Sequence, residues 1–196
     1  MKNTLLNARF YSRHTVTVAQ ELLGKVIVTS QPGSPEITAG RIVETEAYRA
    51  DDPASHSCKG ETPRTSIMFG DPGFAYVYLI YGMYRMLNFV TEPKTYPGAV
   101  LIRALEPLEG HNIMAIRRKN SKHLCNGPGR LCQSLGIEMS DNGESLRGPR
   151  LAVYDDGYSV VKFEASSRIG ITKGLDKQWR FYIPDNAHVS PVRGTQ

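Results

Sequence analysis

Two glutamates, a tyrosine and a histidine lie close together in the stretch RIVETEAYRADDPASHS, residues 41–57, near the end of a predicted apolar strand. Because side chains alternate between the two faces of a strand, Glu44, Glu46 and Tyr48 should share one face. A carboxylate at the end of a strand can accept a proton from water or stabilise positive charge on a substrate. The alternative is that both glutamates are solvated on an open sheet face or paired with lysines.

Arg103 lies in the apolar stretch AVLIRAL, residues 99–105. A guanidinium in such surroundings needs a carboxylate partner. Glu44, Glu46 and Glu106 are all candidates, and the sequence leaves the choice between them open. If Glu46 is the partner, the pair could hold a water molecule between them. A purely structural salt bridge is the competing interpretation.

Aromatic side chains that could enclose a ligand accompany these charged groups. Tyr76 and Tyr78 share one face of a later predicted strand and offer a flat wall. His56 could stack on a ligand, donate a hydrogen bond, or be an ordinary loop histidine. Together with Glu46 and Tyr48, these side chains indicate a carboxylate among aromatic walls, and such a pocket suits a planar heterocycle.

The segment AYVYLIYGMYRMLNF, residues 75–89, predicts a β-hairpin. Gly82 suits the first central position of a two-residue type II′ turn, with Met83 second and Tyr81 and Tyr84 flanking. Hairpin tips are usually polar because water surrounds them. Here either another part of the chain covers the tip, or the tip inserts into a partner, as apolar wedges are pushed between stacked bases.

The composition sets bounds on these hypotheses. A chain of 196 residues, 40% hydrophobic and 22% charged, suits one ordinary globular domain. No apolar run reaches the roughly 20 residues needed to span a bilayer, and the N-terminus lacks the features of a signal peptide. We therefore expect an intracellular protein with no membrane association. The cysteines, Cys58, Cys125 and Cys132, are odd in number and fit neither a disulfide framework nor a common zinc site, so no metal or other cofactor is expected.

The net charge of +5 is unevenly distributed. Residues 110–137 contain five basic residues and no acidic residue. A solvated basic helix face is one explanation, but a positive surface also favours a polyanionic partner. The helix start at 127–130 adds free backbone N–H groups that favour phosphate. The basic residues are Arg117, Arg118, Lys119, Lys122 and Arg130.

The pattern of predicted elements is mostly strands with a few helices, which predicts a single α+β domain over residues 1–196 with an antiparallel sheet. A capping box at 17–20 should open a helix that stops at Gly24, and Ile113 and Ile116 should face inward from a helix over 107–120. A further helix is predicted over 128–136. Strands are predicted over 25–30, 37–48, 74–80, 85–91, 99–105, 151–154, 158–163 and 179–183. The first two should form a hairpin, and so should the strands flanking Asp155-Asp156-Gly157.

Several strings in the chain resemble those of the alkyladenine (3-methyladenine) DNA glycosylases. They are ETEAY with a following histidine, TPRTSIMFGDPG, YVYLIYGMY, Asn88, AVLIRALEPLEG, GPGRLCQSLGI, SRIGI and WRFYI. The resemblance covers nearly the whole chain. It implies a mixed α+β domain that excises 3-methyladenine, 7-methylguanine, hypoxanthine or ethenoadenine from duplex DNA and so initiates base excision repair, with a protruding hairpin that enters the DNA.

The resemblance also implies roles for individual residues. Glu46 matches the general base that activates water, and Arg103 matches the arginine that helps to hold that water. Asn88 matches an asparagine that disfavours the exocyclic amino group of guanine. The start of the helix carries Arg130, where the family usually has lysine. The residues enclosing the flipped base match Tyr48, His56 and Tyr78, with Ile169 at the edge; Tyr81 matches the intercalating residue, and Met83 lies beside it at the tip.

Three rival hypotheses remain at this stage. The first is a lesion-binding protein without catalysis, in which Glu46 is structural. The second is a metal-dependent hydrolase that uses Glu46, His56 and Cys58, and the third is an RNA-binding module. We favour a monofunctional glycosylase, because no lysine stands out as a Schiff-base nucleophile. Its partner should be double-stranded DNA that contains damaged purines, bound by a monomer in the bacterial cytoplasm and nucleoid or in a eukaryotic nucleus.

Overall fold

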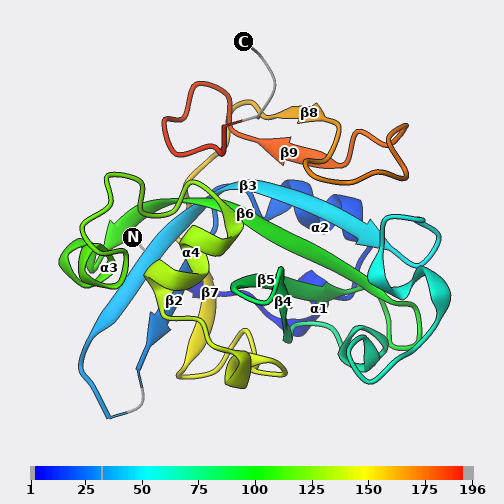
Figure 1. Cartoon of the computed structure of the whole chain (residues 1–196), viewed down its shortest axis with the longest axis horizontal. Helices are drawn as coiled ribbons and strands as arrows, with labels where there is room; N and C mark the ends of the chain where they lie inside the picture. Colours follow the sequence, from blue (N-terminus) through cyan, green and yellow to red (C-terminus); the bar gives the residue numbers. More distant parts are fainter. Residues whose placement is uncertain (1–2, 32, 192–196) are drawn as a thin grey trace.

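The computed structural model describes residues 3–31 and 33–191, so residues 1, 2, 32 and 192–196 of the predicted domain lie outside it. Its centre is a nine-stranded antiparallel sheet (Figure 1). The main path runs through β1 (Thr4–Leu5), β7 (Leu151–Asp155), β2 (Val26–Ser30), β3 (Ile37–Arg49), β6 (Gly98–Glu109), β5 (Tyr84–Thr91) and β4 (Ala75–Ile80). The short strands β8 (Glu164–Ser166) and β9 (Arg180–Tyr182) branch from β3. The α+β prediction is confirmed.

The strand β3 is the element on which the sheet branches. One of its edges pairs with β6 along most of its length. The other edge pairs first with β2, from Ile37 to Arg41, and then with β9, from Glu44 to Glu46. Three register shifts interrupt the ladder between β3 and β6, and two of them, at Ile42/Glu44 and Glu44/Thr45, lie where the branches separate. As a result, the segment that carries both glutamates lies between strands on either side.

Short helices flank the sheet: α1 (Ala8–Tyr11), α2 (Thr15–Glu21), α3 (His111–Arg117) and α4 (Pro128–Leu135), with 3-10 turns η1 (His56–Lys59), η2 (Ser66–Phe69) and η3 (Met139–Asp141). In Figure 1, α2 lies behind β3 and α4 lies in front of it. Buried side chains of α2 and α4 join those of the central strands in the main core, among them Val18, Leu131, Ile42, Leu87 and Ile102. The hairpins β2–β3 and β4–β5 and the helix at 128 are confirmed predictions.

The predicted capping box at 17–20 is wrong. The helix α2 begins at Thr15, so Thr17 lies inside it. Glu92, from the far end of β5, supplies the cap instead: its Oε1 accepts both the Thr15 N–H and the Thr15 hydroxyl at 2.8 Å. A contact between residues this far apart in sequence satisfies the free N–H group of the helix start.

The predicted helix over 107–120 is also too long. Pro107 remains in β6, opposite Gly40 at a register shift, where the ladder tolerates a proline. Gly110, with φ +77°, makes the corner, and α3 follows from His111. With this later start, Met114 is the buried residue and Ile116 is 74% exposed, contrary to the predicted inner position of Ile116.

Residues 158–163 form no strand beside β7, so the predicted hairpin around Asp155-Asp156-Gly157 is wrong. Both edges of β7 are already paired, one with β1 and the other with β2. Arg41 also holds the segment that follows β7: its guanidinium donates to Asp156 at 2.9 and 3.1 Å, and lies over the Tyr158 ring at 4.0 Å. These contacts favour a position for residues 156–158 in which the chain does not fold back to pair with β7.

We expect Gly110→Ala to destabilise the fold more than the same change at a glycine of similar φ in open space. A Cβ on Gly110 would lie 2.5 Å from the Ile37 carbonyl oxygen, whereas at Gly157, with φ +82°, the described residues leave the site open. A left-handed alanine alone costs about 1–2 kcal/mol, so Gly157→Ala should lose about that much and Gly110→Ala clearly more. Urea unfolding of both variants measures the difference, and equal losses would show that the corner is not tightly packed.

Candidate active site

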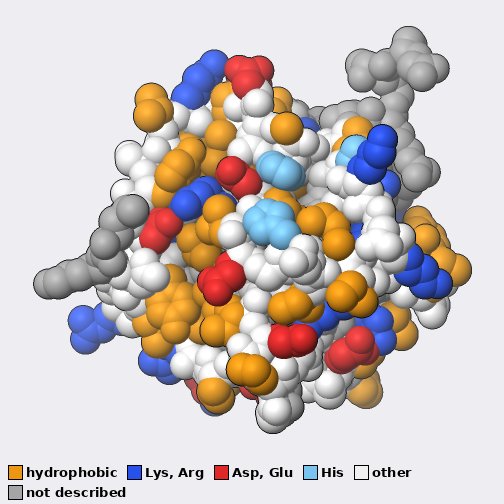
Figure 2. Space-filling model, turned by 90° about the vertical axis from the view of Figure 1, so that its left-hand side faces the viewer, with side chains coloured by type: hydrophobic (Ala, Val, Ile, Leu, Met, Phe, Trp, Pro, Cys, Tyr) orange, Lys and Arg blue, Asp and Glu red, His pale blue; other side chains and the backbone are white. Residues whose placement is uncertain are grey.

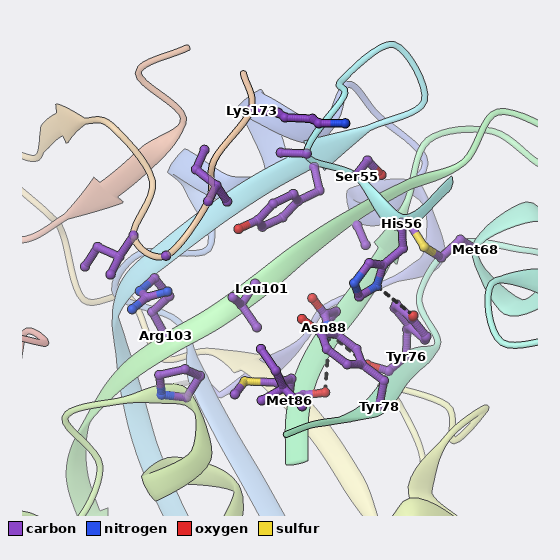
Figure 3. A pocket seen from close by; sticks show the side chains of 18 of the residues that line it. Ser55, His56, Met68, Tyr76, Tyr78, Met86, Asn88, Leu101, Arg103 and Lys173 are labelled. Carbon is purple, nitrogen blue, oxygen red and sulfur yellow. Dashed lines mark hydrogen bonds between the residues drawn. The ribbon is translucent and has the colours of Figure 1, made fainter. Parts of the chain in front are cut away.

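A cavity of about 350 Å³ opens between the central strands and two loops, residues 53–56 and 169–173 (Figure 3). Six of the seven side chains predicted to meet around a ligand or water line it, all except Glu46: Tyr48, His56, Tyr78, Asn88, Arg103 and Ile169. Strands supply four of them, from β3, β4, β5 and β6, so neighbouring ladders fix their spacing. The loops supply the other two. The sheet therefore forms one wall of the cavity, and the loops close it.

The Glu46 carboxylate lies behind this wall, fully buried, between three of the lining residues. Its Oε2 accepts the Tyr48 hydroxyl at 2.7 Å. Its Oε1 accepts the Ile169 N–H at 2.7 Å and lies 3.3 Å from Arg103 Nη1. All three neighbours donate, so the side chain is held as an acceptor, which is the role of an ionised carboxylate.

Arg103 bridges two carboxylates. Its Nε lies 3.2 Å from Glu44 Oε1, in addition to the contact with Glu46. Burial opposes the charge on Arg103, but the neighbouring Glu46 and Glu44 carboxylates prevail and raise its pKa. Of the three partners left open by the sequence, Glu106 has another contact, since its Oε2 accepts from Asn186 at 3.3 Å.

Glu44 is fully buried, like Glu46, so the solvated-face alternative for the two glutamates is wrong. Glu44 Oε1 also accepts from Arg180 Nε at 2.6 Å, and its Oε2 accepts the Ser190 N–H at 2.8 Å. Glu44 is therefore an anchor that joins β3, β9 and the segment around residue 190. Glu46 is the carboxylate on the cavity side.

The tyrosine next to Glu46 stays protonated. Burial, followed by the charge of Glu46, holds the pKa of Tyr48 well above its usual range. Burial is also the main cause of the raised pKa of Tyr78, with Tyr76 and Glu46 contributing. A protonated Tyr48 can only present its hydroxyl hydrogen to Glu46, which fixes the direction of that hydrogen bond.

His56 and two tyrosines of β4 form the aromatic wall of the cavity. The His56 ring lies edge-on to Tyr78, with centroids 4.6 Å apart, and Tyr76 and Tyr78 are 5.3 Å apart. His56 Nδ1 shares a 3.0 Å hydrogen bond with the Tyr76 hydroxyl (Figure 3). Burial, and then the charge of Arg64, lower the pKa of His56. The imidazole is thus neutral near pH 7 and its orientation is fixed by Tyr76.

Asn88 is held rigidly in the same region. Its amide Nδ2 donates to the Tyr76 carbonyl at 3.1 Å and to the Met86 carbonyl at 3.3 Å. Both donor hydrogens are used within the hairpin, so the side chain cannot turn without losing them. Asn88 gives the cavity a fixed polar edge.

The hairpin tip differs from the predicted turn. Ile80 pairs with Tyr84, and Met83 N–H donates to the Ile80 carbonyl, so Tyr81 and Gly82 are the central residues, with φ +53° and +68°. Positive φ at both positions is typical of a type I′ turn, so the type II′ prediction is wrong. Tyr81 is 82% exposed and Met83 63% exposed, which excludes the alternative of a covered tip. Tyr81 also lines the cavity.

Two of the predicted basic contacts support the fold. Arg117 Nη1 donates to the Ser134 carbonyl at 3.0 Å, and Arg118 Nη1 donates to Gln133 Oε1, so both side chains lie against α4. Burial is the main reason why the pKa of each is lowered. On the face of the molecule around α3, Lys and Arg side chains lie among Asp and Glu side chains (Figure 2).

The start of α4 is the part of the basic region that reaches the cavity. Pro128 lines the cavity, and a Cβ on Gly129 would lie 3.1 Å from the Tyr84 ring, so the helix packs against the first residue of β5 and leaves Tyr81 and Met83 exposed. Arg130 Nη1 donates to Asn126 Oδ1 at 2.7 Å. The remaining predicted contacts, Lys119 and Lys122, are exposed on the loop after α3.

Some site residues were missed by the sequence analysis. Tyr76 was noted only as a wall, yet its hydroxyl holds His56. Leu101 lines the cavity two residues before Arg103, as strand alternation would have indicated. Lys173 and the buried pair of Asp52 and Arg168 carry no local sequence signal, because loop geometry brings them into place.

The metal-hydrolase rival gains no support. Within residues 3–31 and 33–191 there is no group of three His, Cys, Asp or Glu side chains arranged to bind a metal ion.

In the same part of the chain, no helix is long and apolar enough to cross a membrane. Cys58 is a free, exposed thiol with Sγ near the Pro53 carbonyl, while Cys125 and Cys132 are buried free thiols whose pKa values burial raises to about 11 and about 12.

A buried acceptor carboxylate beside an aromatic cavity, with the exposed Tyr81 in the cavity lining, can stabilise positive charge and accept a proton when a bond to a planar ligand is hydrolysed. The comparisons with known proteins agree: a family model described as Methylpurine-DNA glycosylase (MPG) matches residues 9–187. The chain belongs to this family and is a hydrolase of N-glycosyl bonds of the DNA-3-methyladenine glycosylase type. The resemblance identified from the sequence is confirmed.

The relatives cover almost the whole chain. Three that carry the name "Putative 3-methyladenine DNA glycosylase" come from Methanocella arvoryzae, Clostridium perfringens and Desulfitobacterium hafniense. The first is 48% identical over 188 residues, covering 92% of this chain and 93% of its own. The second is 46% identical over 205 residues and the third 44% over 200, each covering 94% of this chain and 98% of its own.

We expect the lowered pKa of His56 to make stability depend on pH. The unfolded histidine, with a pKa near 6.5, binds a proton before the folded one does, so the contribution of His56 is present above pH 6.5 and is lost as the pH falls through the lower folded value. Urea unfolding at pH 7.5 and 5.5 should therefore show a larger acid loss for wild type than for His56→Gln. The exposed His111→Gln serves as control and should behave like wild type. Equal losses for wild type and His56→Gln would contradict the buried, neutral imidazole.

Proposed function

We propose that this protein is a monofunctional DNA glycosylase that turns alkylated or deaminated purines out of duplex DNA and hydrolyses their N-glycosyl bonds. The observation that carries the proposal is the placement of Glu46. Its carboxylate accepts three donors and lies directly behind the cavity wall, between Tyr48, Ile169 and Arg103. In base excision repair this reaction is the first step.

The chemistry follows from that carboxylate. As the bond between C1′ and the base breaks, the base takes the electron pair and positive charge develops on the sugar, which a nearby carboxylate stabilises. Water then bonds to C1′, and Glu46 accepts the proton that the water loses. Arg103 supports the reaction by holding the carboxylate and, in our proposal, the water beside it.

The lesion classes follow from the leaving group. A 3-methyladenine or 7-methylguanine already carries positive charge and leaves as a neutral base. Hypoxanthine or ethenoadenine is neutral and needs a proton as it leaves. In our proposal the fixed polar edge of the Asn88 amide disfavours the exocyclic amino group of normal guanine. The 7-methylguanine base carries the same group, but its positive charge makes it a much better leaving group.

The aromatic residues account for extrusion of the base. We propose that Tyr48, His56 and Tyr78 enclose the flipped base, with Ile169 at its edge, while Tyr81 fills the gap left in the duplex and Met83 packs beside it. Flipping costs a few kcal/mol, and less for a damaged or mispaired base, which contributes to selectivity. The high exposure of Tyr81 supports this role, since it leaves the ring free to enter a base stack.

The DNA backbone would be held through charge. We propose that the exposed Lys119 and Lys122, and the start of α4 at Arg130, contact DNA phosphates. Arg117 and Arg118 hold α3 against α4 and add to the positive electrostatic potential of this surface. We propose that the protein acts as a monomer, with the hairpin tip and the neighbouring cavity engaging one lesion. We expect the protein to act in the compartment that contains the chromosomal DNA, which is the cytoplasm and nucleoid of a bacterium or the nucleus of a eukaryote.

We also propose that the reaction leaves the sugar–phosphate strand intact. A Schiff-base mechanism needs a lysine amine at C1′, close to the catalytic carboxylate. Lys173 lines the cavity, but Figure 3 shows its amine at the rim, pointing away from Arg103. The geometry therefore favours water over lysine as the nucleophile.

Glu46→Gln should slow excision strongly while DNA binding persists. General-base catalysis contributes about 10²–10⁴-fold, so single-turnover release of hypoxanthine from a duplex should fall by about that factor. Affinity for the same duplex should stay near that of wild type, because glutamine keeps the shape of the side chain. Glu36→Gln, at an exposed position away from the cavity, is the matched control and should retain full activity.

The same experiment decides between the proposal and its rival. If wild type binds lesion duplexes but releases neither hypoxanthine nor ethenoadenine, nor 3-methyladenine from alkylated DNA, the chain is a lesion-binding protein. If Glu46→Gln remains as active as wild type, the enzyme stands and the proposed base is wrong. Strand breaks without alkali treatment would contradict the monofunctional reaction.

A further inference from the structure

A second buried ion pair lies beside the cavity, formed by Arg168 and Asp52. Both side chains are fully buried. The pair is bidentate: Arg168 Nη1 contacts Asp52 Oδ2, and Nη2 donates to Asp52 Oδ1 at 2.9 Å. Two parallel contacts between a planar guanidinium and a carboxylate fix both orientation and distance.

The pair joins three segments that form the wall of the cavity. Arg168 Nη1 also donates to the Ala47 carbonyl of β3 at 2.8 Å, and Nη2 donates to the Gly174 carbonyl at 3.3 Å. Asp52 Oδ1 accepts the Ala54 N–H at 3.1 Å. The end of β3, the loop that leads to His56 and the loop that follows residue 168 are thereby held at one point.

The guanidinium also lies close to two aromatic rings. Its Cζ is 4.6 Å from the centroid of Tyr48 and 5.4 Å from that of Trp179. Cation–π attraction favours this arrangement, more so where water is excluded. Tyr48 is the ring whose hydroxyl donates to Glu46, so Arg168 fixes the plane in which that hydroxyl lies.

The residue after Arg168 supplies another of the donors to Glu46, since the Ile169 N–H lies 2.7 Å from Oε1. With the Arg168 side chain anchored to Asp52 and to two carbonyls, the backbone at 169 has little freedom to move. Two of the three donors around Glu46, the Tyr48 hydroxyl and the Ile169 N–H, are therefore set by one side chain that does not itself touch the carboxylate.

We infer that Arg168, held by Asp52, is a positioning residue for cleavage of the N-glycosyl bond, and that it acts by setting the Tyr48 hydroxyl and the Ile169 N–H against Glu46. This inference rests on the proposed role of Glu46. A lysine cannot replace the arginine, because a single ammonium group lacks the planar fork that reaches Asp52 and two carbonyls at once.

The chain offers a closely matched control in Arg150. This arginine is also paired in a bidentate manner, with Nε 2.9 Å from Asp141 Oδ1 and Nη2 2.8 Å from Oδ2. It also donates to two backbone carbonyls, those of Ser30 and Gly136. Neither Arg150 nor Asp141 lines the cavity. Arg150→Lys should therefore lose a similar set of hydrogen bonds without affecting the Glu46 carboxylate.

The test compares Arg168→Lys, Asp52→Asn and Arg150→Lys in single-turnover excision of hypoxanthine with enzyme in saturating excess. Small displacements of catalytic groups cost up to about a hundredfold in rate, so we expect the first two variants to lose roughly ten- to a hundredfold and Arg150→Lys to match wild type. The Kd for a duplex with a stable tetrahydrofuran abasic analogue should stay at the wild-type value in all three. The double variant Arg168→Lys/Asp52→Asn should be no slower than the slower single variant, because the pair acts as a unit.

Three results would overturn the inference. The first is an unchanged excision rate in Arg168→Lys and Asp52→Asn, and the second is an equal loss of rate in Arg150→Lys. The third is a slow rate in Arg168→Lys or Asp52→Asn that returns to the wild-type rate at higher enzyme concentration. Should Arg168→Lys fail to fold, Asp52→Asn, which keeps the shape of the side chain, decides alone. Glu46→Gln is assayed in parallel. If Glu46→Gln loses excision and Arg168→Lys does not, only this inference fails; if Glu46→Gln is fully active, the proposed function of Glu46 fails first.

Discussion

The guanidinium of Arg103 lies between two fully buried carboxylates, 3.2 Å from Glu44 and 3.3 Å from Glu46. Arg180 adds a second positive charge on Glu44, and Ser190 donates its N–H to the same side chain. Removing one partner from a buried ion pair leaves an uncompensated charge and costs about 3–5 kcal/mol. Because these groups come from β3, β6, β9 and the segment around residue 190, the requirement to pair them also holds the branches of the sheet together.

The two glutamates of β3 have different roles in this arrangement. The Glu44 oxygens are occupied by Arg103 of β6, Arg180 of β9 and the Ser190 N–H. The Glu46 oxygens are occupied by donors that line the cavity. At the register shift between Glu44 and Thr45, Arg103 lies between the paired residues Ile102 and Ala104 of β6, and both glutamates contact it. A fixed acceptor beside an aromatic cavity is then available for a reaction that develops positive charge.

Sequence patterns predicted much of the sheet and of the site. Alternation along the strands placed Glu46 near Tyr48 and Tyr76 near Tyr78. The apolar surroundings of Arg103 predicted a carboxylate partner without choosing it, and the resemblance supplied the roles of these residues. What the sequence could not supply depends on contacts between distant residues. The capping of α2 by Glu92, the diversion of the chain by Arg41 and Asp156, and the clamp of Arg168 on Asp52 have no local signal. Local turn chemistry also misled, because two positive φ angles fell on Tyr81 and Gly82.

The central claim is that Arg103 serves the reaction by holding Glu46. The most direct measurement is a double-mutant cycle on single-turnover excision, with Glu46→Gln, Arg103→Lys and the two combined, at saturating enzyme. The account predicts that Arg103→Lys slows wild type, yet slows Glu46→Gln no further, since the carboxylate through which it acts is already absent. Losses that multiply in the double variant would contradict the account and show that Arg103 acts on the substrate independently of Glu46.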